Sequence, residues 1–202
     1  MTTIRSFIAI ELSDEVRTML TDLQSRLKAI VPPNTVRWTA PQNVHLTLHF
    51  LGNVAVDDVT QVTNVLPVVT SSVSPFSLTL QGLDCFPNPR RPSIVWVGIS
   101  GELETLVKLY HELGEMLKQS ISFEPEKRPY SPHLTIGRVK KGIPPRRLSQ
   151  LGQALEQEQA NVGQLAALKV TWISLIKSEL TPTGPIYTPL ARGLLKNVER
   201  KV

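Results

Sequence analysis

One short pattern occurs twice in this sequence: HLTL at residues 45–48 and HLTI at residues 133–136. Each copy lies in an apolar segment, follows a turn that contains proline, and has an amphipathic helical segment of similar length upstream. Alternation along a β-strand places the histidine and the threonine of each copy on one face and the apolar residues on the opposite, buried face. The repeat therefore predicts an internal duplication in which two similar strands face each other across a cleft.

Hydrophobic periodicity divides the chain into strands and helices that are mixed along the sequence. Alternation predicts strands over residues 6–12, 36–39, 44–51, 76–83, 93–99, 133–139, 169–177 and 185–190. Helical spacing predicts four helices: from the cap Ser13 to Ile30, from Asp57 to the residue before Pro67, over residues 103–117, and after Pro144-Pro145. Short turns join several adjacent strands, which favours antiparallel pairing, so the predicted fold class is α+β.

The composition is that of an ordinary globular chain and excludes several other classes. Of the 202 residues, 41% are hydrophobic and 19% are charged, which does not fit a disordered protein. No apolar run reaches the roughly 18 residues of a membrane helix, and the N-terminus does not resemble a secretory signal, so we expect a cytoplasmic protein without a membrane partner. No long linker divides residues 1–202, and no heptad or exposed apolar stripe demands a partner, so we expect a monomer.

The net charge, the glycine-rich loop motifs and the cysteine count indicate which ligands and cofactors to expect. The net charge of +5 is scattered along the chain, which is compatible with steering of phosphates and equally with mere solubility. No GxGxxG or GxxxxGK[ST] loop follows a predicted strand. The single cysteine, Cys85, cannot form a cysteine metal cluster. We therefore expect no cofactor and no metal.

The residues of the repeat are suited to acid–base chemistry on a phosphate. Histidine has an ordinary pKa of about 6.5, so both protonation states of His45 and His133 are populated at neutral pH. Two histidines on opposite sides of a phosphate suit an in-line displacement, in which one removes a proton and the other delivers one. The hydroxyls of Thr47 and Thr135 can donate to non-bridging oxygens without titrating. Arg138 could clamp a phosphate oxygen, although strict alternation places it on the wrong face.

Four further side chains near the repeat have open interpretations. By alternation, His49 shares the face of His45 and is predicted to lie at the rim of the site, whereas Phe50 is predicted to lie in the core. Trp38 and Tyr130 precede the two copies of the repeat. Each of them is either a core residue or a ring that stacks on a nucleobase at the mouth of the cleft.

The segments around the repeat resemble a known family. VRWTAPQNVHLTLHFLGNV and KRPYSPHLTIGRV are similar to the two signature segments of the 2H phosphoesterase superfamily, and IRSFIAIELSDEV, GLDCFPNPRRPSIVWVGI and ISLIKSELTPTGPIYTPLA extend the resemblance over essentially the whole chain. The resemblance is to the bacterial and archaeal RNA 2',3'-cyclic phosphodiesterases, also called 2'-5' RNA ligases. It implies a bilobal, pseudo-symmetric α+β fold, in which residues 1–202 form one domain of two intertwined lobes with one His-x-Thr motif each.

The resemblance also implies an activity and roles for the repeat. The family hydrolyses the terminal 2',3'-cyclic phosphate of RNA to a 2'-phosphate without a metal. By position, His45 matches the proton donor to the departing O3', and His133 matches the proton acceptor that activates water. Thr47 and Thr135 match the phosphate-binding hydroxyls, and Arg138 matches a basic residue that often follows the second motif.

Several hypotheses remain open from the sequence. The two halves are nearly symmetric, so the histidines could exchange roles in a reverse 2'-5' ligation. The chain could instead be an RNA- or nucleotide-binding module without turnover, or a phosphodiesterase for a small cyclic nucleotide. Position 49 also departs from the family, whose members commonly carry lysine or arginine where this chain has His49.

Overall fold

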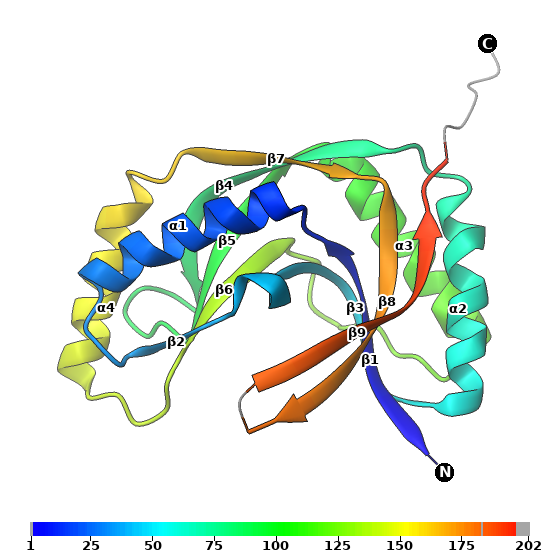
Figure 1. Cartoon of the computed structure of the whole chain (residues 1–202), viewed down its shortest axis with the longest axis horizontal. Helices are drawn as coiled ribbons and strands as arrows, with labels where there is room; N and C mark the ends of the chain where they lie inside the picture. Colours follow the sequence, from blue (N-terminus) through cyan, green and yellow to red (C-terminus); the bar gives the residue numbers. More distant parts are fainter. Residues whose placement is uncertain (1, 183, 197–202) are drawn as a thin grey trace.

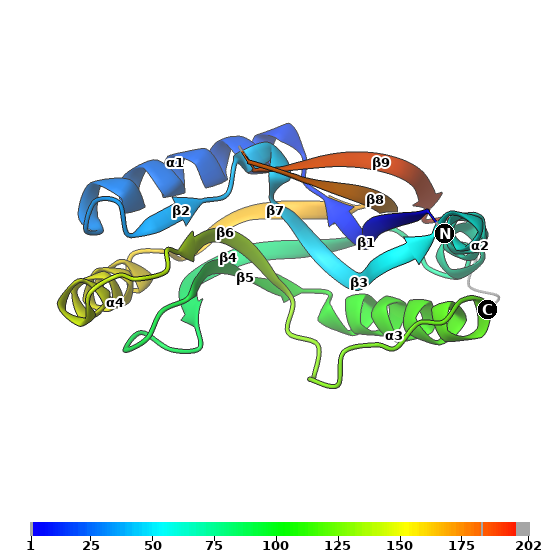
Figure 2. The ribbon, with the colours of Figure 1, turned by 90° about the horizontal axis from the view of Figure 1, so that it is seen from below.

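The computed structural model describes residues 2–182 and 184–196. The nine strands in these residues form one sheet. The strand order is β7-β4-β5-β6-β3-β1-β8-β9, with β2 paired to β6, and the strand pairs are antiparallel. The sheet is strongly curled (Figure 2), with helices α1 and α4 gathered at one end and α2 and α3 at the other (Figure 1). The predicted α+β class is confirmed.

Both copies of the repeat stand at the beginnings of strands. The strands are β1 (Thr3–Glu11), β2 (Val36–Trp38), β3 (His45–Ala55), β4 (Phe76–Phe86), β5 (Ile94–Gly101), β6 (His133–Val139), β7 (Gln164–Val170), β8 (Trp172–Thr181) and β9 (Gly184–Leu194). The helices are α1 (Asp14–Ile30), α2 (Val56–Thr70), α3 (Leu103–Ser120) and α4 (Pro145–Gln159), with a short 3₁₀ turn at Pro41–Asn43. In the described residues, no helix combines the length and apolarity needed to cross a membrane.

Helix α1 forms where the sequence predicts it, for local reasons. The Ser13 hydroxyl accepts a hydrogen bond from the Val16 amide at 3.3 Å, which satisfies one of the free amides of the first turn. Asp14 and Glu15 occupy that turn, where the helix dipole favours negative charge. The helix ends directly before the Pro32-Pro33 pair, and its leucines pack into the core.

The predicted end of the second helix is wrong. Helix α2 continues through Pro67 to Thr70, although proline has no amide hydrogen to donate to the carbonyl of Thr63. The final turn is stabilised by burial: Leu66 and Val69 are almost completely buried in the core. Packing of this apolar face therefore outweighs the loss of one helical hydrogen bond.

The predicted strand over residues 169–177 is also wrong, because this segment belongs to two strands. β7 ends at Val170 and β8 begins at Trp172, so the chain turns at Thr171. β7 pairs with β4, whereas β8 pairs with β1 on the other side of the sheet. The apolar alternation runs through this corner without a proline or glycine, so the sequence carries no signal of the break.

Both motif strands contain one extra residue directly after the motif threonine. The register between β1 and β3 shifts at Leu48, and the register between β5 and β6 shifts at Ile136, as in β-bulges. At the second bulge, the buried side chain of Gln24 on α1 donates to the carbonyl of Ile136 at 2.9 Å. Helix α1 thus supports the strand that carries the second motif.

Each bulge reverses the inward and outward alternation for the residues that follow it. His49 and Gly137 are therefore buried, and Phe50 and Arg138 are exposed. Glycine is required at position 137, because a Cβ there would lie 2.7 Å from Cγ1 of Val36. The prediction that His49 lies at the rim and Phe50 in the core is wrong for both residues.

The two motif strands are direct neighbours at the centre of the sheet. β3 and β6 are paired at Leu46 and Leu134, and both leucine side chains are completely buried. Because cross-strand partners share a face, the histidines and threonines on either side of these leucines share the opposite face. The repeat thus brings two histidines and two threonines to one surface of the sheet.

Candidate active site

A cleft of about 720 Å³ lies over β2, β3 and β6 and is bounded by the β8–β9 hairpin. Side chains of both copies of the repeat line it: His45, Thr47, His133, Thr135 and Arg138. The hairpin is attached to the turn before β3, because the amide nitrogen of the Asn43 side chain donates to the carbonyl of Pro185 at 3.0 Å. All five predicted catalytic and phosphate-binding residues therefore lie in one cleft.

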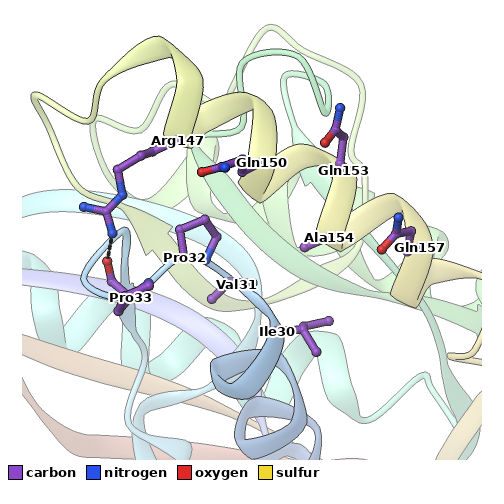
Figure 3. A pocket seen from close by; sticks show the side chains of 9 residues that line it. All are labelled: Ile30, Val31, Pro32, Pro33, Arg147, Gln150, Gln153, Ala154 and Gln157. Carbon is purple, nitrogen blue, oxygen red and sulfur yellow. Dashed lines mark hydrogen bonds between the residues drawn. The ribbon is translucent and has the colours of Figure 1, made fainter.

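A second hollow of about 530 Å³ lies between the end of α1 and α4 (Figure 3). Three glutamines of α4, Gln150, Gln153 and Gln157, line one side of it. Its one charged lining side chain, Arg147, donates to the carbonyl of Pro33. This hollow therefore lacks a pair of titratable groups, and the cleft over the repeat is the candidate active site.

The two histidines are held in the same way. Nδ1 of His45 lies 2.8 Å from the carbonyl oxygen of Asn43, and Nδ1 of His133 lies 2.7 Å from that of Ser131, in each case two residues earlier. Because a carbonyl oxygen only accepts, Nδ1 carries the hydrogen in both rings. Nε2 of each ring remains available to a ligand, as a proton acceptor when the ring is neutral and as a donor when it is charged.

The surroundings of the two rings are not equivalent. His45 stacks on Phe7 with ring centroids 4.5 Å apart and meets the edge of Tyr187 at 5.3 Å. Burial lowers the pKa of His45 to about 4, and the charge of Arg138 acts in the same direction, whereas the hydrogen bond to Asn43 opposes both. In the free protein His45 is therefore neutral at pH 7.

This lowered pKa predicts a pH dependence of stability. Between pH 6.5 and pH 5 the unfolded chain binds a proton at His45 that the folded chain does not, so the free energy of unfolding falls with falling pH, by about 2 kcal/mol over this range. Urea denaturation of wild type and of His45→Asn at pH 7 and pH 5 measures this contribution. The variant should lose about 2 kcal/mol less than wild type, and an equal loss in both proteins would contradict the prediction.

The threonines and Arg138 complete the polar part of the cleft. Thr47 and Thr135 lie two residues after their histidines, on the same face, and both line the cleft. Arg138 reaches that face because of the bulge at Ile136, which removes the objection raised by strict alternation. Two hydroxyl donors and one guanidinium group thus accompany the two imidazoles, and groups of both kinds can donate to phosphate oxygens.

The two predicted base-stacking residues differ in position. Trp38 lines the cleft, while part of its ring packs against Gly137 and the core. Tyr130 is not among the lining residues of the cleft: its ring stacks on Tyr110 with centroids 4.0 Å apart, and its hydroxyl donates to the carbonyl of Thr47 at 3.0 Å. Tyr110 covers one face of this ring, and the base-stacking role of Tyr130 stays a prediction.

Tyr130 connects the segment before His133 to the strand of the first motif. β3 and β6 are paired at Leu46 and Leu134 alone, so the hydrogen bond to Thr47 adds a second link between the motifs. Burial raises the pKa of Tyr130, so this hydroxyl stays protonated and remains a donor.

We expect Tyr130→Phe to lower kcat roughly fivefold for the cyclic-phosphate hydrolysis that the family resemblance implies. The substitution loses about 1 kcal/mol of hydrogen bonding, which loosens the strand that holds the Thr47 hydroxyl. Steady-state kinetics should show the loss in kcat more than in KM. Tyr110→Phe is the matched control, since it removes a hydroxyl from the stacked ring and leaves the bond to Thr47 intact. Equal losses in the two variants would contradict a positioning role for the Tyr130 hydroxyl.

The sequence analysis missed many lining residues of the cleft, among them Arg37, Phe50, Arg128 and Tyr187. Phe50 had a usable signal, because alignment of the two copies of the repeat places it at the position of Arg138. Arg37, Arg128 and Tyr187 are brought in by β2, by the segment before β6 and by β9. They had no signal of their own, because only the tertiary fold places them beside the repeat.

A curled antiparallel sheet with two His-x-Thr pairs in one cleft agrees with the 2H phosphoesterase resemblance. The description of the family model that matches is "LigT like Phosphoesterase", and it matches residues 10–96 and 99–187. Each matched segment contains one copy of the repeat. The chain belongs to the LigT-like phosphoesterase family.

Individual relatives agree with this assignment. The chain is 36% identical to an RNA 2',3'-cyclic phosphodiesterase of Methanothermobacter thermautotrophicus, over 93% of this chain and 96% of the relative. It is 32% identical to a protein of the same name from Thermotoga maritima, over 92% of each chain. Among solved structures, E. coli LigT in complex with 3'-AMP superimposes with a TM-score of 0.73 and 25% identity, covering 96% of this chain and 99% of that one.

Proposed function

We propose that this protein is a hydrolase that opens the 2',3'-cyclic phosphate at RNA ends to a 2'-phosphate. The observation that carries the proposal is the pair of histidines in one cleft, each with Nδ1 bound to a carbonyl and Nε2 free. Relatives named RNA 2',3'-cyclic phosphodiesterase, which align over nearly the whole chain, support the same reaction. The substrate partner is RNA with a cyclic end.

In the proposed reaction, the cyclic phosphate lies between the two imidazoles. Nε2 of His133 accepts a proton from a water molecule as that water attacks phosphorus. The bond between phosphorus and O3' breaks, and Nε2 of His45 gives its proton to O3'. The step leaves His133 charged and His45 neutral, and exchange of protons with solvent restores the starting state. The roles of the two histidines follow the family resemblance.

The other polar groups act on the charge that develops in this step. The Thr47 and Thr135 hydroxyls donate to the non-bridging oxygens, and the Arg138 guanidinium adds a positive charge beside them. None of these groups competes with the histidines for the transferred protons, because none loses a proton near neutral pH. Reversal of the step with a 5'-hydroxyl of RNA in place of water would form a 2'-5' linkage, since the cyclic ester stores the required energy.

The lowered pKa of His45 fits a donor that is charged only when the substrate is bound. A cyclic phosphodiester carries a negative charge, and an opposite charge within hydrogen-bond distance raises the pKa of an imidazole. Binding of the substrate thus draws a proton to His45. This coupling lets the free site remain neutral at His45 and still provides an acid in the complex.

We also propose that the chain works as a single domain of two intertwined lobes. Each half of the chain supplies one motif, and β2 from the first half pairs with β6 of the second. Neither half alone would possess both histidines. Separate halves are therefore expected to lack the activity.

The regiochemistry of the product tests the proposed reaction. Incubation of an oligoribonucleotide with a cyclic end should yield one phosphomonoester, and ³¹P NMR should assign it to the 2' position. Binding of the RNA without conversion would instead favour a binding module without turnover. Conversion of cyclic mononucleotides alone would favour a phosphodiesterase for small cyclic nucleotides.

A further inference from the structure

Two arginines stand directly opposite each other at one edge of the cleft. Arg37 on β2 is the register partner of Arg138 on β6, and both side chains are exposed and line the cleft. Cross-strand partners lie on one face of a sheet with Cβ atoms about 5 Å apart, and like charges in this position are destabilising. The fold therefore accepts a repulsion here that a pair of neutral residues would avoid.

This repulsion is not neutralised inside the protein. Several arginines of the chain have carboxylate partners, as in the pairs Arg26–Glu158 and Arg192–Glu11. Within residues 2–182 and 184–196, no ion pair involves Arg37 or Arg138. Glu126 is the one carboxylate among the described residues that line the cleft, and a third arginine, Arg128, lines it as well. An excess of positive charge is thus left for an anionic ligand.

The position of Arg37, across the strand pair from Arg138, separates it from the reacting phosphate. His133 begins β6 and Arg138 lies five residues later, a span of roughly 15 Å along an extended strand. The long side chain of Arg138 can cover part of this distance towards the histidines, and its charge acts on His45. Arg37 lies across from Arg138 on β2, so its guanidinium is placed for a second anion at the same end of the cleft.

We propose that Arg37, beside the Arg138 that serves the reacting phosphate, forms a second phosphate site that binds the internucleotide phosphate preceding the cyclic end. This inference rests on the proposed function and specifies its substrate: a cyclic end on an oligonucleotide is preferred over a cyclic mononucleotide. A guanidinium group is suited to this contact, because it donates two parallel hydrogen bonds to phosphate oxygens. A ligand with one phosphate leaves Arg37 without a partner.

Three substrates, of which only one carries an internucleotide charge, test the site: adenosine 2',3'-cyclic phosphate, a diadenosine ending in the cyclic phosphate, and the same dinucleotide with an uncharged methylphosphonate linkage. Wild type should show a kcat/KM for the charged dinucleotide about tenfold above the values for the other two, as expected for one partly exposed charge-assisted hydrogen bond. Arg37→Gln should abolish this preference, and Arg37→Lys should retain part of it, because the charge is kept and the fork is lost.

Arg146→Gln is the matched control, since it removes the same charge from an exposed position of α4 that does not line the cleft. It should keep the wild-type preference. Equal rates of wild type on the charged and uncharged dinucleotides would overturn the second site while leaving the hydrolase intact. An equal loss on all three substrates in Arg37→Gln would overturn it as well. Absence of hydrolysis of all three substrates by wild type would remove the proposed function itself.

Discussion

Replacement of either His45 or His133 by alanine should lower kcat/KM for an RNA 2',3'-cyclic phosphate by a factor of about 10² to 10⁴. Each substitution removes one Nε2 from the cleft and with it one of the two proton transfers of the proposed step. The double variant should lose little more than the worse single variant, because the two groups act in one step and their effects do not add.

Both variants should remain folded, because neither ring belongs to the fully buried core. His111→Ala is the control: His111 lies on the exposed side of α3 and should keep wild-type activity. Initial rates on a fluorescent RNA, with thermal unfolding of each variant, provide the measurement. More than a tenth of wild-type activity in either cleft variant would contradict its assignment as an acid or a base.

Loss of a threonine hydroxyl should have the second largest effect. We expect Thr47→Val and Thr135→Val each to lower kcat by about 10²-fold, which is the lower end of the range for removing one preorganised donor to a developing negative charge. Valine keeps the shape of threonine and the strand preference, so the change removes a hydroxyl and little else. In the proposed mechanism the hydroxyls bind the transition state more strongly than the ground state, so KM should change less than kcat.

Serine at the same positions provides the matched test of this assignment. Thr47→Ser and Thr135→Ser keep the hydroxyl and should recover most of the activity that valine removes. Circular dichroism and unfolding temperatures of the four variants check that the strands are intact. If the serine and valine variants lose activity equally, the hydroxyls do not bind the phosphate and their role is structural.

The features that were predictable from the sequence are those with local causes. Helix α1 has its cap, its acidic first turn and its terminating prolines within one segment, so its bounds follow from the sequence. The repeated His-x-Thr pattern predicted one shared cleft, because strand alternation holds over the three residues of each motif. The two histidines and two threonines of the candidate site were found in this way, whereas alternation argued against Arg138.

Alternation failed to predict which side chains point inward immediately after each motif. A bulge there depends on the pairing with the partner strand, and the strand's own sequence pattern does not reveal it. The extra residues Leu48 and Ile136 are ordinary apolar strand residues, so nothing in them signals a shift of register. The same error misplaced His49 and Phe50 and raised a false objection to Arg138. Comparison of the two copies with each other would have corrected the placement of Phe50, since Phe50 and Arg138 each lie five residues after the histidine of their motif.

Two further features of the structure, the end of α2 and the position of Tyr130, depend on tertiary contacts. Helix α2 passes through Pro67 because burial of its last turn outweighs one missing hydrogen bond. The ring of Tyr130 stacks on Tyr110 of α3, a residue that only the packing of that helix against β3 brings near. Neither the burial nor the contact is encoded in the local pattern.

The most direct test is a mass measurement on a short RNA that ends in a 2',3'-cyclic phosphate, incubated with the protein in EDTA. The proposed mechanism needs only the imidazoles, the hydroxyls, the Arg138 guanidinium and water, so chelation should not slow the wild type. The predicted result is a gain of one water by the RNA with wild type, and none with His45→Ala or His133→Ala. Hydrolysis that stops in EDTA and returns with a divalent metal, or that persists in both variants, would contradict the two-histidine mechanism.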